Sequence, residues 1–165
     1  MNKSILLNHA EITLKLDRIA WQILEHHVDS DSIVLVGLID RGAEVAKKIK
    51  TILQKHSTKN ILHTTINVNK DAPLESPIDI ENPTIIQHNS VVLVDDVLNS
   101  GTTLVAALRE VLAYTPKSVM TAVLANRDHH KFPIQANFVG LSLSTTLKEH
   151  ILFEEKNGKM CVYLC

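Results

Sequence analysis

The stretch from Val91 to Thr103, V-V-L-V-D-D-V-L-N-S-G-T-T, constrains the fold of this chain more than any other. Its first four residues are aliphatic and mostly β-branched, which is typical of a strand buried on both faces inside a parallel sheet. Two carboxylates, Asp95 and Asp96, follow at the end of this strand. After a short turn, the apolar spacing from Thr102 to about Tyr114 predicts an amphipathic helix.

The turn between this strand and helix has the composition of an anion-binding site. Backbone N–H groups and the positive end of the helix dipole face the turn, and a glycine allows the backbone to approach a ligand closely. Hydroxyl side chains add hydrogen-bond donors that suit a phosphate. The residues assigned to this phosphate site are Asn99, Ser100, Gly101, Thr102 and Thr103.

The acidic pair narrows the class of ligand. Asp95 and Asp96 would repel a polyphosphate placed directly on them, but they accept hydrogen bonds from sugar hydroxyls and bind hydrated Mg²⁺. A simpler interpretation is that Asp96 caps a turn and the hydroxyls cap a helix, which is the commoner role for any one such residue. Because all these features coincide, we favour a ligand with a terminal phosphate and a diol-bearing sugar.

This stretch resembles the 5-phosphoribosyl-1-diphosphate (PRPP) signature of type I phosphoribosyltransferases, in which an aliphatic run, two acidic residues and a short spacer precede T-G-x-T. Ser100 stands where the family usually has threonine and keeps the hydroxyl. The resemblance implies that residues 99 to 103 anchor the 5′-phosphate. It also implies that Asp95 and Asp96 hold the ribose hydroxyls, and that they hold Mg²⁺ through water or through the ligand.

A second strand, loop and helix begins at Ile33, and glycines bracket its loop, G-L-I-D-R-G. Taken alone, this pattern fits a tight turn as well as an anion site. The segment resembles G-I-K-T-R-G in the pyrimidine operon attenuator proteins that are also uracil phosphoribosyltransferases. The resemblance assigns the diphosphate to Asp40, Arg41 and Gly42, and it makes Arg41 a catalytic residue beside Asp95 and Asp96. Ile39 and Asp40 replace the family's lysine and threonine.

The segment from Ala125 to Gly140, A-N-R-D-H-H-K-F-P-I-Q-A-N-F-V-G, resembles V-D-R-G-H-R-E-L-P-I-R-A-D-Y-I-G of the same family. In that family it forms a wall over the pyrimidine base. A surface connection between strands is the alternative interpretation. The residues to which the resemblance assigns base recognition are Arg127, His129, Phe132, Pro133 and Ile134.

The remaining pattern predicts one domain, residues 1–165, with an α/β fold: a doubly wound, mainly parallel sheet of the type I phosphoribosyltransferase kind. Asn8 and Glu11 predict the start of a first helix. Residues 67–89, which we call the hood loop, are expected to form a mobile lid. Asn157-Gly158 predicts a C-terminal β-hairpin that closes the sheet. Cys161 and Cys165 are expected to be reduced thiols.

Composition limits the partners of the protein. With 17 basic and 18 acidic residues, the chain has no overall basic field, so we expect RNA binding to be weak at most. No apolar run approaches the length of a membrane span, and we expect a cytoplasmic protein with no membrane association. We also expect a homodimer or a larger homo-oligomer.

The reaction implied by the resemblance is transfer of ribose 5-phosphate from PRPP to a nucleobase, with uracil as the favoured base, which gives uridine monophosphate and diphosphate. Two alternatives remain open at this point. One is a regulator that senses pyrimidine nucleotides and binds an mRNA leader with little turnover. The other is a purine phosphoribosyltransferase, because the PRPP signature does not specify the base.

Overall fold

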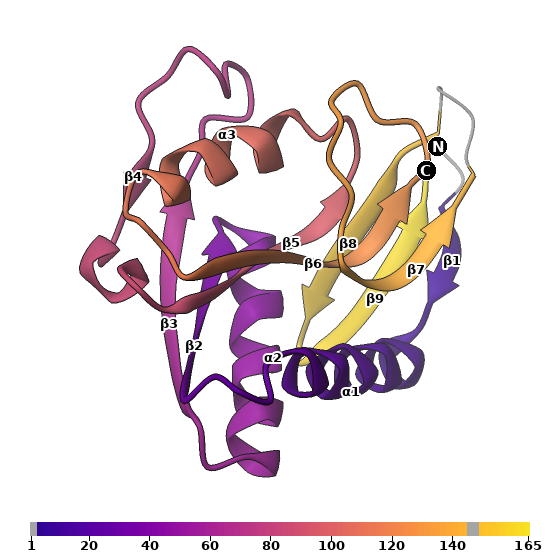
Figure 1. The fold of residues 1–165 in the computed structure, drawn as a ribbon. Coiled ribbons are helices and arrows are strands. Elements are labelled where there is room, and N and C mark those ends of the chain that lie inside the picture. Colours follow the sequence, from indigo (N-terminus) through magenta and orange to yellow (C-terminus); the bar gives the residue numbers. More distant parts are fainter. Residues whose placement is uncertain (1–2, 145–148) are drawn as a thin grey trace.

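A six-stranded sheet forms the centre of the computed structural model, which describes residues 3–144 and 149–165 (Figure 1). Its strand order is β4-β3-β2-β5-β6-β7. All neighbouring strands are parallel except β4, which is antiparallel to β3. The strands are β2 (Ser32–Leu38), β3 (Asn60–Asn67), β4 (Asp79–Ile80), β5 (Ser90–Leu98), β6 (Ser118–Arg127) and β7 (Phe138–Leu143).

Helices cover both faces of this sheet, as a doubly wound fold requires (Figure 1). The helices α1 (His9–His26) and α2 (Arg41–His56) share one apolar core with Val92 and Val94 of β5. The helix α3 (Thr102–Leu112) shares the other core with Val91 and Leu93. A 3₁₀ helix, η1 (Pro83–Ile86), lies in the hood loop. The predicted fold class is therefore confirmed.

The strand β5 lies between β2 and β6, and its residues from Val91 to Val94 are fully buried. It is longer than the sequence predicts, because it continues through the acidic pair to Leu98. The strand keeps one constant register with β6, from Ser90 opposite Ser118 to Leu98 opposite Asn126. Asp95 and Asp96 therefore lie within the strand near its carboxyl end, and the expectation that they follow it was wrong.

The first helix starts where the sequence predicts. Asn8 and Glu11 form a capping box, with bonds of 3.1 Å to the Glu11 N–H and 2.8 Å to the Asn8 N–H. The helix ends at His26, and His27 is its buried C-cap residue. The His27 Nδ1 atom lies 2.8 Å from the Ile23 carbonyl oxygen, and burial lowers the pKa of this imidazole.

The C-terminal hairpin is confirmed, but it does not extend the central sheet. Its strands β8 (Ile151–Lys156) and β9 (Lys159–Leu164) form a separate antiparallel sheet with β1 (Ser4–Leu7), in the order β1-β9-β8. Asn157 and Gly158 both have positive φ, as a two-residue hairpin turn with matching twist requires. The sheet packs on the α1 and α2 side through side chains that include Phe153 and Val162.

Three further features of the fold bear on the sequence-based predictions. The short strand β1 was not predicted, because its pairing partner β9 lies at the other end of the sequence. Cys161 and Cys165 are free, as expected. Within the described part of the chain, no helix is both long enough and apolar enough to cross a membrane.

Candidate active site

The predicted site residues meet at one edge of the central sheet, where β2, β5 and β6 end. In parallel sheets this edge is the usual place for a ligand. Three loops leave it: the loop before α2, which we call the diphosphate loop (residues 37–42), the phosphate turn (residues 99–103) and the base loop (residues 128–137). Each loop is named after the part of the ligand that the sequence analysis assigns to it.

The diphosphate loop is pressed against the sheet at its two glycines. A Cβ atom at Gly37 would lie 2.6 Å from the Ala43 Cα atom. A Cβ atom at Gly42 would lie 2.8 Å from the Val94 carbonyl oxygen and 3.0 Å from the Asp95 Oδ1 atom. The glycines thus allow the N-terminus of α2 to reach the acidic pair. The Ile39–Asp40 peptide bond in this loop is cis.

Asp95 lies in an environment that opposes its charge. Burial, followed by the neighbouring Asp96 carboxylate, raises the pKa of the Asp95 carboxyl well above its ordinary value. Asp95 Oδ1 accepts a 2.8 Å hydrogen bond from the Asp96 backbone N–H, and the Asp96 side chain is itself buried. The ammonium group of Lys70 acts in the opposite direction on the Asp95 pKa. The hood loop therefore brings a positive charge toward the acidic pair.

The phosphate turn surrounds a small hollow of about 50 Å³, whose lining includes Asn99, Ser100, Gly101 and Thr103 together with Asp95. Gly101 has a φ of 83°, a conformation that other residues rarely adopt. The Ser100 hydroxyl lies 3.0 Å from the Thr102 hydroxyl and accepts a long bond from the Thr102 N–H. Hydroxyl side chains and the N-terminus of α3 thus lie in the same turn, an arrangement that suits an anion.

The base loop packs directly on the phosphate turn. The Ser100 carbonyl accepts hydrogen bonds from the backbone N–H groups of Lys131 (2.9 Å) and Phe132 (3.3 Å). A Cβ atom at Gly101 would lie 2.6 Å from the Ile134 Cγ2 atom. A hollow of about 440 Å³ opens on this loop, and its lining includes Phe132, Pro133 and Ile134.

Arg127 and His129 occupy different positions, although they are two residues apart. Arg127 is the last residue of β6 and is buried, and its Nη1 atom donates a 3.4 Å hydrogen bond to Asn99 Oδ1. His129 is exposed on the base loop. Of the two, Arg127 therefore connects β6 to the phosphate turn, while His129 faces solvent.

Sequence reasoning missed a polar network at the start of the base loop. His130 Nε2 lies 3.0 Å from Asn126 Oδ1, and the Ser144 hydroxyl donates a 2.6 Å bond to Asp128 Oδ2. The Asn126 amide also contacts Asp128 at 3.4 Å. An asparagine at the carboxyl end of a buried strand was the available signal, because such a polar residue has no place in the core.

Sequence reasoning also missed the contribution of the hairpin to the diphosphate loop. A hollow of about 350 Å³ is lined by Asp40, Arg41 and Glu44 from the α2 end and by residues 153–156 of β8. Glu155 of this strand pairs with Lys48 at 3.0 Å. The hollow contains more carboxylates than cations, which disfavours a bare diphosphate.

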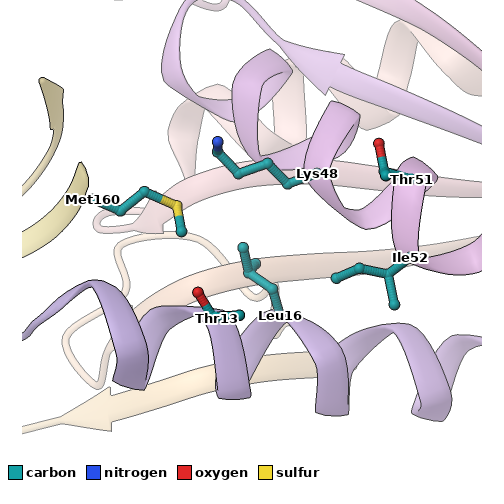
Figure 2. Close-up of a pocket in the computed structure, with 6 residues that line it drawn as sticks. All are labelled: Thr13, Leu16, Lys48, Thr51, Ile52 and Met160. Atoms are coloured by element: carbon teal, nitrogen blue, oxygen red, sulfur yellow. The ribbon is translucent and has the colours of Figure 1, made fainter. Parts of the chain in front are cut away.

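A separate apolar cavity of about 220 Å³ lies between α1 and α2, as Figure 2 shows. Leu16 and Ile52 face each other across it, and Met160 of β9 closes one side. It includes none of the predicted site residues.

The parallel sheet with helices on both faces, two strand-loop-helix units and an acidic pair at one edge define a doubly wound α/β protein. Residues 2–156 match the family model described as the phosphoribosyl transferase domain. The chain therefore belongs to the phosphoribosyltransferase domain family, and within it to the group that contains the PyrR proteins.

Two relatives illustrate the match within this group. The Bifunctional protein PyrR of Macrococcus caseolyticus is 31% identical over 173 residues, which cover 99% of each chain. The Bifunctional protein PyrR of Geobacter sulfurreducens is 34% identical over 171 residues, which cover 98% of this chain and 97% of the relative.

Solved structures agree with the fold. A hypoxanthine phosphoribosyltransferase from Staphylococcus aureus has a TM-score of 0.75 at 18% identity, and the match covers 87% of this chain and 80% of that one. A hypoxanthine-guanine phosphoribosyltransferase from Bacillus anthracis has a TM-score of 0.74 at 17% identity, with 98% of both chains covered. At these identities the likeness shows the fold alone.

The environment of Asp95 leads to a first prediction. A carboxyl whose pKa is raised in the folded state stabilises that state at acidic pH, and this contribution is lost as the pH rises through the raised pKa. We therefore expect Asp95→Asn to be at least as stable as wild type at pH 7, with its advantage growing from acidic to neutral pH. Urea unfolding across this pH range measures the difference.

Leu93→Ala is the matched control on the same strand, because Leu93 is fully buried in the core. It should lose about 2–5 kcal/mol of unfolding free energy at every pH. A loss of similar size in Asp95→Asn would show that the carboxylate is a structural part of the strand.

Proposed function

We propose that this phosphoribosyltransferase transfers ribose 5-phosphate from PRPP to uracil and releases uridine monophosphate and diphosphate. The observation that carries the proposal is the contact of the phosphate turn with the base loop and of the diphosphate loop with the acidic pair. One extended ligand can therefore span all three loops. The ligand that the PRPP-like signature implies has a phosphate at one end and a diphosphate at the other.

The phosphate turn and the acidic pair bind different parts of the sugar phosphate. In this proposal, Asn99, Ser100, Gly101, Thr102 and Thr103 bind the 5′-phosphate through hydroxyls and backbone N–H groups. Asp95 and Asp96 accept hydrogen bonds from the ribose hydroxyls. Positive charge develops on the ribose ring as the diphosphate leaves, and carboxylates stabilise that charge more strongly than they stabilise the neutral ground state.

The diphosphate loop binds the leaving group. Arg41 is exposed and, within the described part of the chain, has no ion-pair partner, so its guanidinium is available for bidentate contacts with phosphate oxygens. Gly42 brings the α2 N-terminus close to the acidic pair. Asp40 contributes its backbone to the loop, while its carboxylate weakens the attraction for a free diphosphate.

Mg²⁺ fits this donor set as a cation shared with the substrate. No group of three or more His, Cys, Asp or Glu side chains in the described residues could hold a metal ion by itself. The neighbouring carboxylates of Asp95 and Asp96 do suit a hydrated Mg²⁺ whose other ligands come from the substrate, because a cation would offset the charge repulsion that raises the pKa of Asp95. Asp95 and Asp96 would hold it directly or through water, and it would supply charge neutralisation for the diphosphate.

The base loop recognises the nucleobase in this proposal. Phe132, Pro133 and Ile134 line the hollow on this loop, and Arg127 and His129 are the hydrogen-bond donors that the proposal assigns to the base. The hood loop covers the reacting centre and excludes water, with Lys70 approaching the acidic pair. PRPP and the nucleotide product are highly charged and do not cross membranes unaided, so we propose a cytoplasmic site of action.

Turnover with individual bases tests the reaction. We expect PRPP and Mg²⁺ to give diphosphate release with uracil, and much less with hypoxanthine, guanine, xanthine or adenine. The double variant Asp95→Asn, Asp96→Asn should lose transfer while it keeps wild-type folding, because the pair serves the ligand. Lys55→Gln, at the far end of α2, is a control that should keep full activity. Faster diphosphate release with a purine base than with uracil would identify the purine as the substrate and contradict the proposal.

Binding of PRPP tests the metal separately from turnover. We expect calorimetry to show much weaker PRPP binding in the presence of a chelator than with Mg²⁺, because Arg41 alone cannot offset the diphosphate beside Asp40 and Glu44. Asp95→Asn, Asp96→Asn should lower the dependence on Mg²⁺. Equal affinities with and without the metal in the wild-type protein would contradict the assignment.

A regulatory role is the second candidate, and the name Bifunctional protein PyrR of the relatives favours it. In this proposal the protein also senses pyrimidine nucleotides and contacts an mRNA leader. The densest basic group is Lys47, Lys48 and Lys50 on α2, and two of these lysines are already ion-paired: Lys47 with Glu44 at 2.9 Å and Lys48 with Glu155 at 3.0 Å. This group therefore offers little free positive charge to RNA.

Titration with RNA across a salt series measures this contribution. We expect weak binding, a shallow salt slope that corresponds to about two or three phosphate contacts, and little preference for a pyrimidine-leader hairpin over an unrelated hairpin. Lys50→Gln should reduce the binding slightly, and Lys3→Gln, outside this basic group, should not change it. Tight and selective binding that strengthens with uridine monophosphate would make regulation the principal function.

A further inference from the structure

The polar network at the start of the base loop has a fixed hydrogen-bond direction. Its carboxylate belongs to Asp128, and an ionised carboxylate accepts hydrogen bonds but cannot donate them. The Asp128 Oδ2 atom accepts from the Ser144 hydroxyl at 2.6 Å, and the Asp128 Oδ1 atom lies 3.4 Å from the Asn126 Nδ2 atom. The Asn126 amide therefore turns its nitrogen toward Asp128 and its oxygen away from it.

This direction decides which nitrogen of His130 carries the proton. The His130 Nε2 atom lies 3.0 Å from the Asn126 Oδ1 atom, which can only accept, so the proton is on Nε2. In a neutral imidazole the other nitrogen, Nδ1, is then a hydrogen-bond acceptor. Among the residues that the structure describes, none donates a hydrogen bond to Nδ1. This atom is therefore available to a ligand.

His130 also borders the hollow of about 440 Å³ on the base loop, a volume within the usual range for small-molecule sites. The backbone N–H groups of the next two residues, Lys131 and Phe132, donate to the phosphate turn. The hollow therefore lies beside the proposed sugar-phosphate site. The residues described around it are His130, Phe132, Pro133, Ile134 and Gln135.

We propose that His130 selects the nucleobase, because its Nδ1 atom accepts a hydrogen bond from a ring N–H group of the base. The inference rests on the proposed function, which brings a base to this hollow. Uracil carries such a group at N3, between its two carbonyl groups. Cytosine has no hydrogen at N3 and presents a lone pair there, so two acceptors would face each other and its binding is disfavoured.

The same bond defines a class of base. Hypoxanthine and guanine also have a ring N–H group beside a carbonyl group, whereas adenine has a ring nitrogen without hydrogen at that position. His130 therefore favours oxo bases over amino bases and does not by itself separate uracil from hypoxanthine. The remaining selection has to come from the shape of the site.

Asn126 acts through His130 as a positioning residue. Without an acceptor for Nε2, the imidazole would be free to carry its proton on Nδ1, which would then be a donor that suits cytosine. The family segment V-D-R-G-H-R has aspartate, glycine and arginine where this chain has Asn126, Asp128 and His130. The arrangement thus depends on residues in which this chain differs from the family segment.

Steady-state transfer to uracil and to cytosine by two variants tests the role of His130. His130→Asn keeps an acceptor oxygen near the position of Nδ1 but is too short to reach Asn126. His130→Gln reaches Asn126 with its amide but leaves no acceptor at the position of Nδ1. We expect His130→Gln to raise KM for uracil with little change in kcat and to lower the preference for uracil over cytosine by about tenfold or more. His130→Asn should keep most of that preference.

His56→Gln is the matched control, because His56 is exposed at the far end of α2. It should keep the KM and the preference of wild type, and urea unfolding should show that all variants are folded. A wild-type preference in His130→Gln, with the preference lost in His130→Asn, would show that His130 only holds the loop in place. That result would overturn the proposal.

Nucleotide binding separates this inference from transfer itself. In calorimetry, the wild-type protein should bind uridine monophosphate more tightly than cytidine monophosphate, and His130→Gln should bind the two with similar affinities. This pattern in a protein without transfer would contradict the proposed function and support the role of His130. Equal affinities of the wild-type protein for the two nucleotides would overturn that role even if transfer to uracil is found.

Nitrogen NMR of isotope-labelled protein measures the tautomer directly. The His130 signals, identified by their loss in His130→Gln, should show the proton on Nε2 in the wild-type protein. Asn126→Ala should increase the share of the form with the proton on Nδ1 and should lower the preference for uracil over cytosine. A wild-type His130 ring with its proton on Nδ1 would overturn the proposal.

Discussion

The pairing of β5 with β2 and β6 is the constraint on which the rest of the structure depends. Both neighbours are parallel to β5, so three strands end at one edge and deliver their loops to the same place. The fully buried aliphatic run from Val91 to Val94 fixes the strand by burial on both faces. This pairing holds Asp95 beside Asp96 in a position that disfavours the charge of Asp95.

The folded protein therefore has an unfavourable electrostatic interaction at the proposed active site. The raised pKa of Asp95 shows that the folded protein does not favour its ionised form in the absence of a ligand. Groups that satisfy this charge, such as a sugar hydroxyl, a cation or Lys70 of the hood loop, are then bound more favourably. Stability is supplied elsewhere, by the two apolar cores on either side of the sheet.

Local patterns in the sequence predict much of this fold. The capping pair Asn8 and Glu11, the aliphatic run before Asp95 and the Asn157-Gly158 turn each depend on residues close together in the chain, and each is where it was expected. The continuation of β5 through two carboxylates was missed, because charged residues disfavour a strand locally while pairing with β6 overrides that preference. The pairing of β1 with β9 was missed because it joins the two ends of the sequence.

The same distinction applies to the candidate site. The glycines, hydroxyls and carboxylates of the loops are readable as chemistry, whereas the presence of β8 beside Arg41 and the bond from Arg127 to Asn99 arise from packing between distant segments. Neither leaves a local signal in the residues around it. The position of a loop in space is thus harder to predict than the chemistry that its residues can support.

The contact between Gly101 and Ile134 limits how this protein can change. Ile134 Cγ2 occupies the space that any side chain at position 101 would need, so the wall of the base loop also fixes the shape of the phosphate turn. A larger or differently branched residue at position 134 would displace the phosphate turn. In the function proposed above, base preference and affinity for the phosphoribosyl donor are therefore coupled, and a change in one loop requires compensating substitutions in the other.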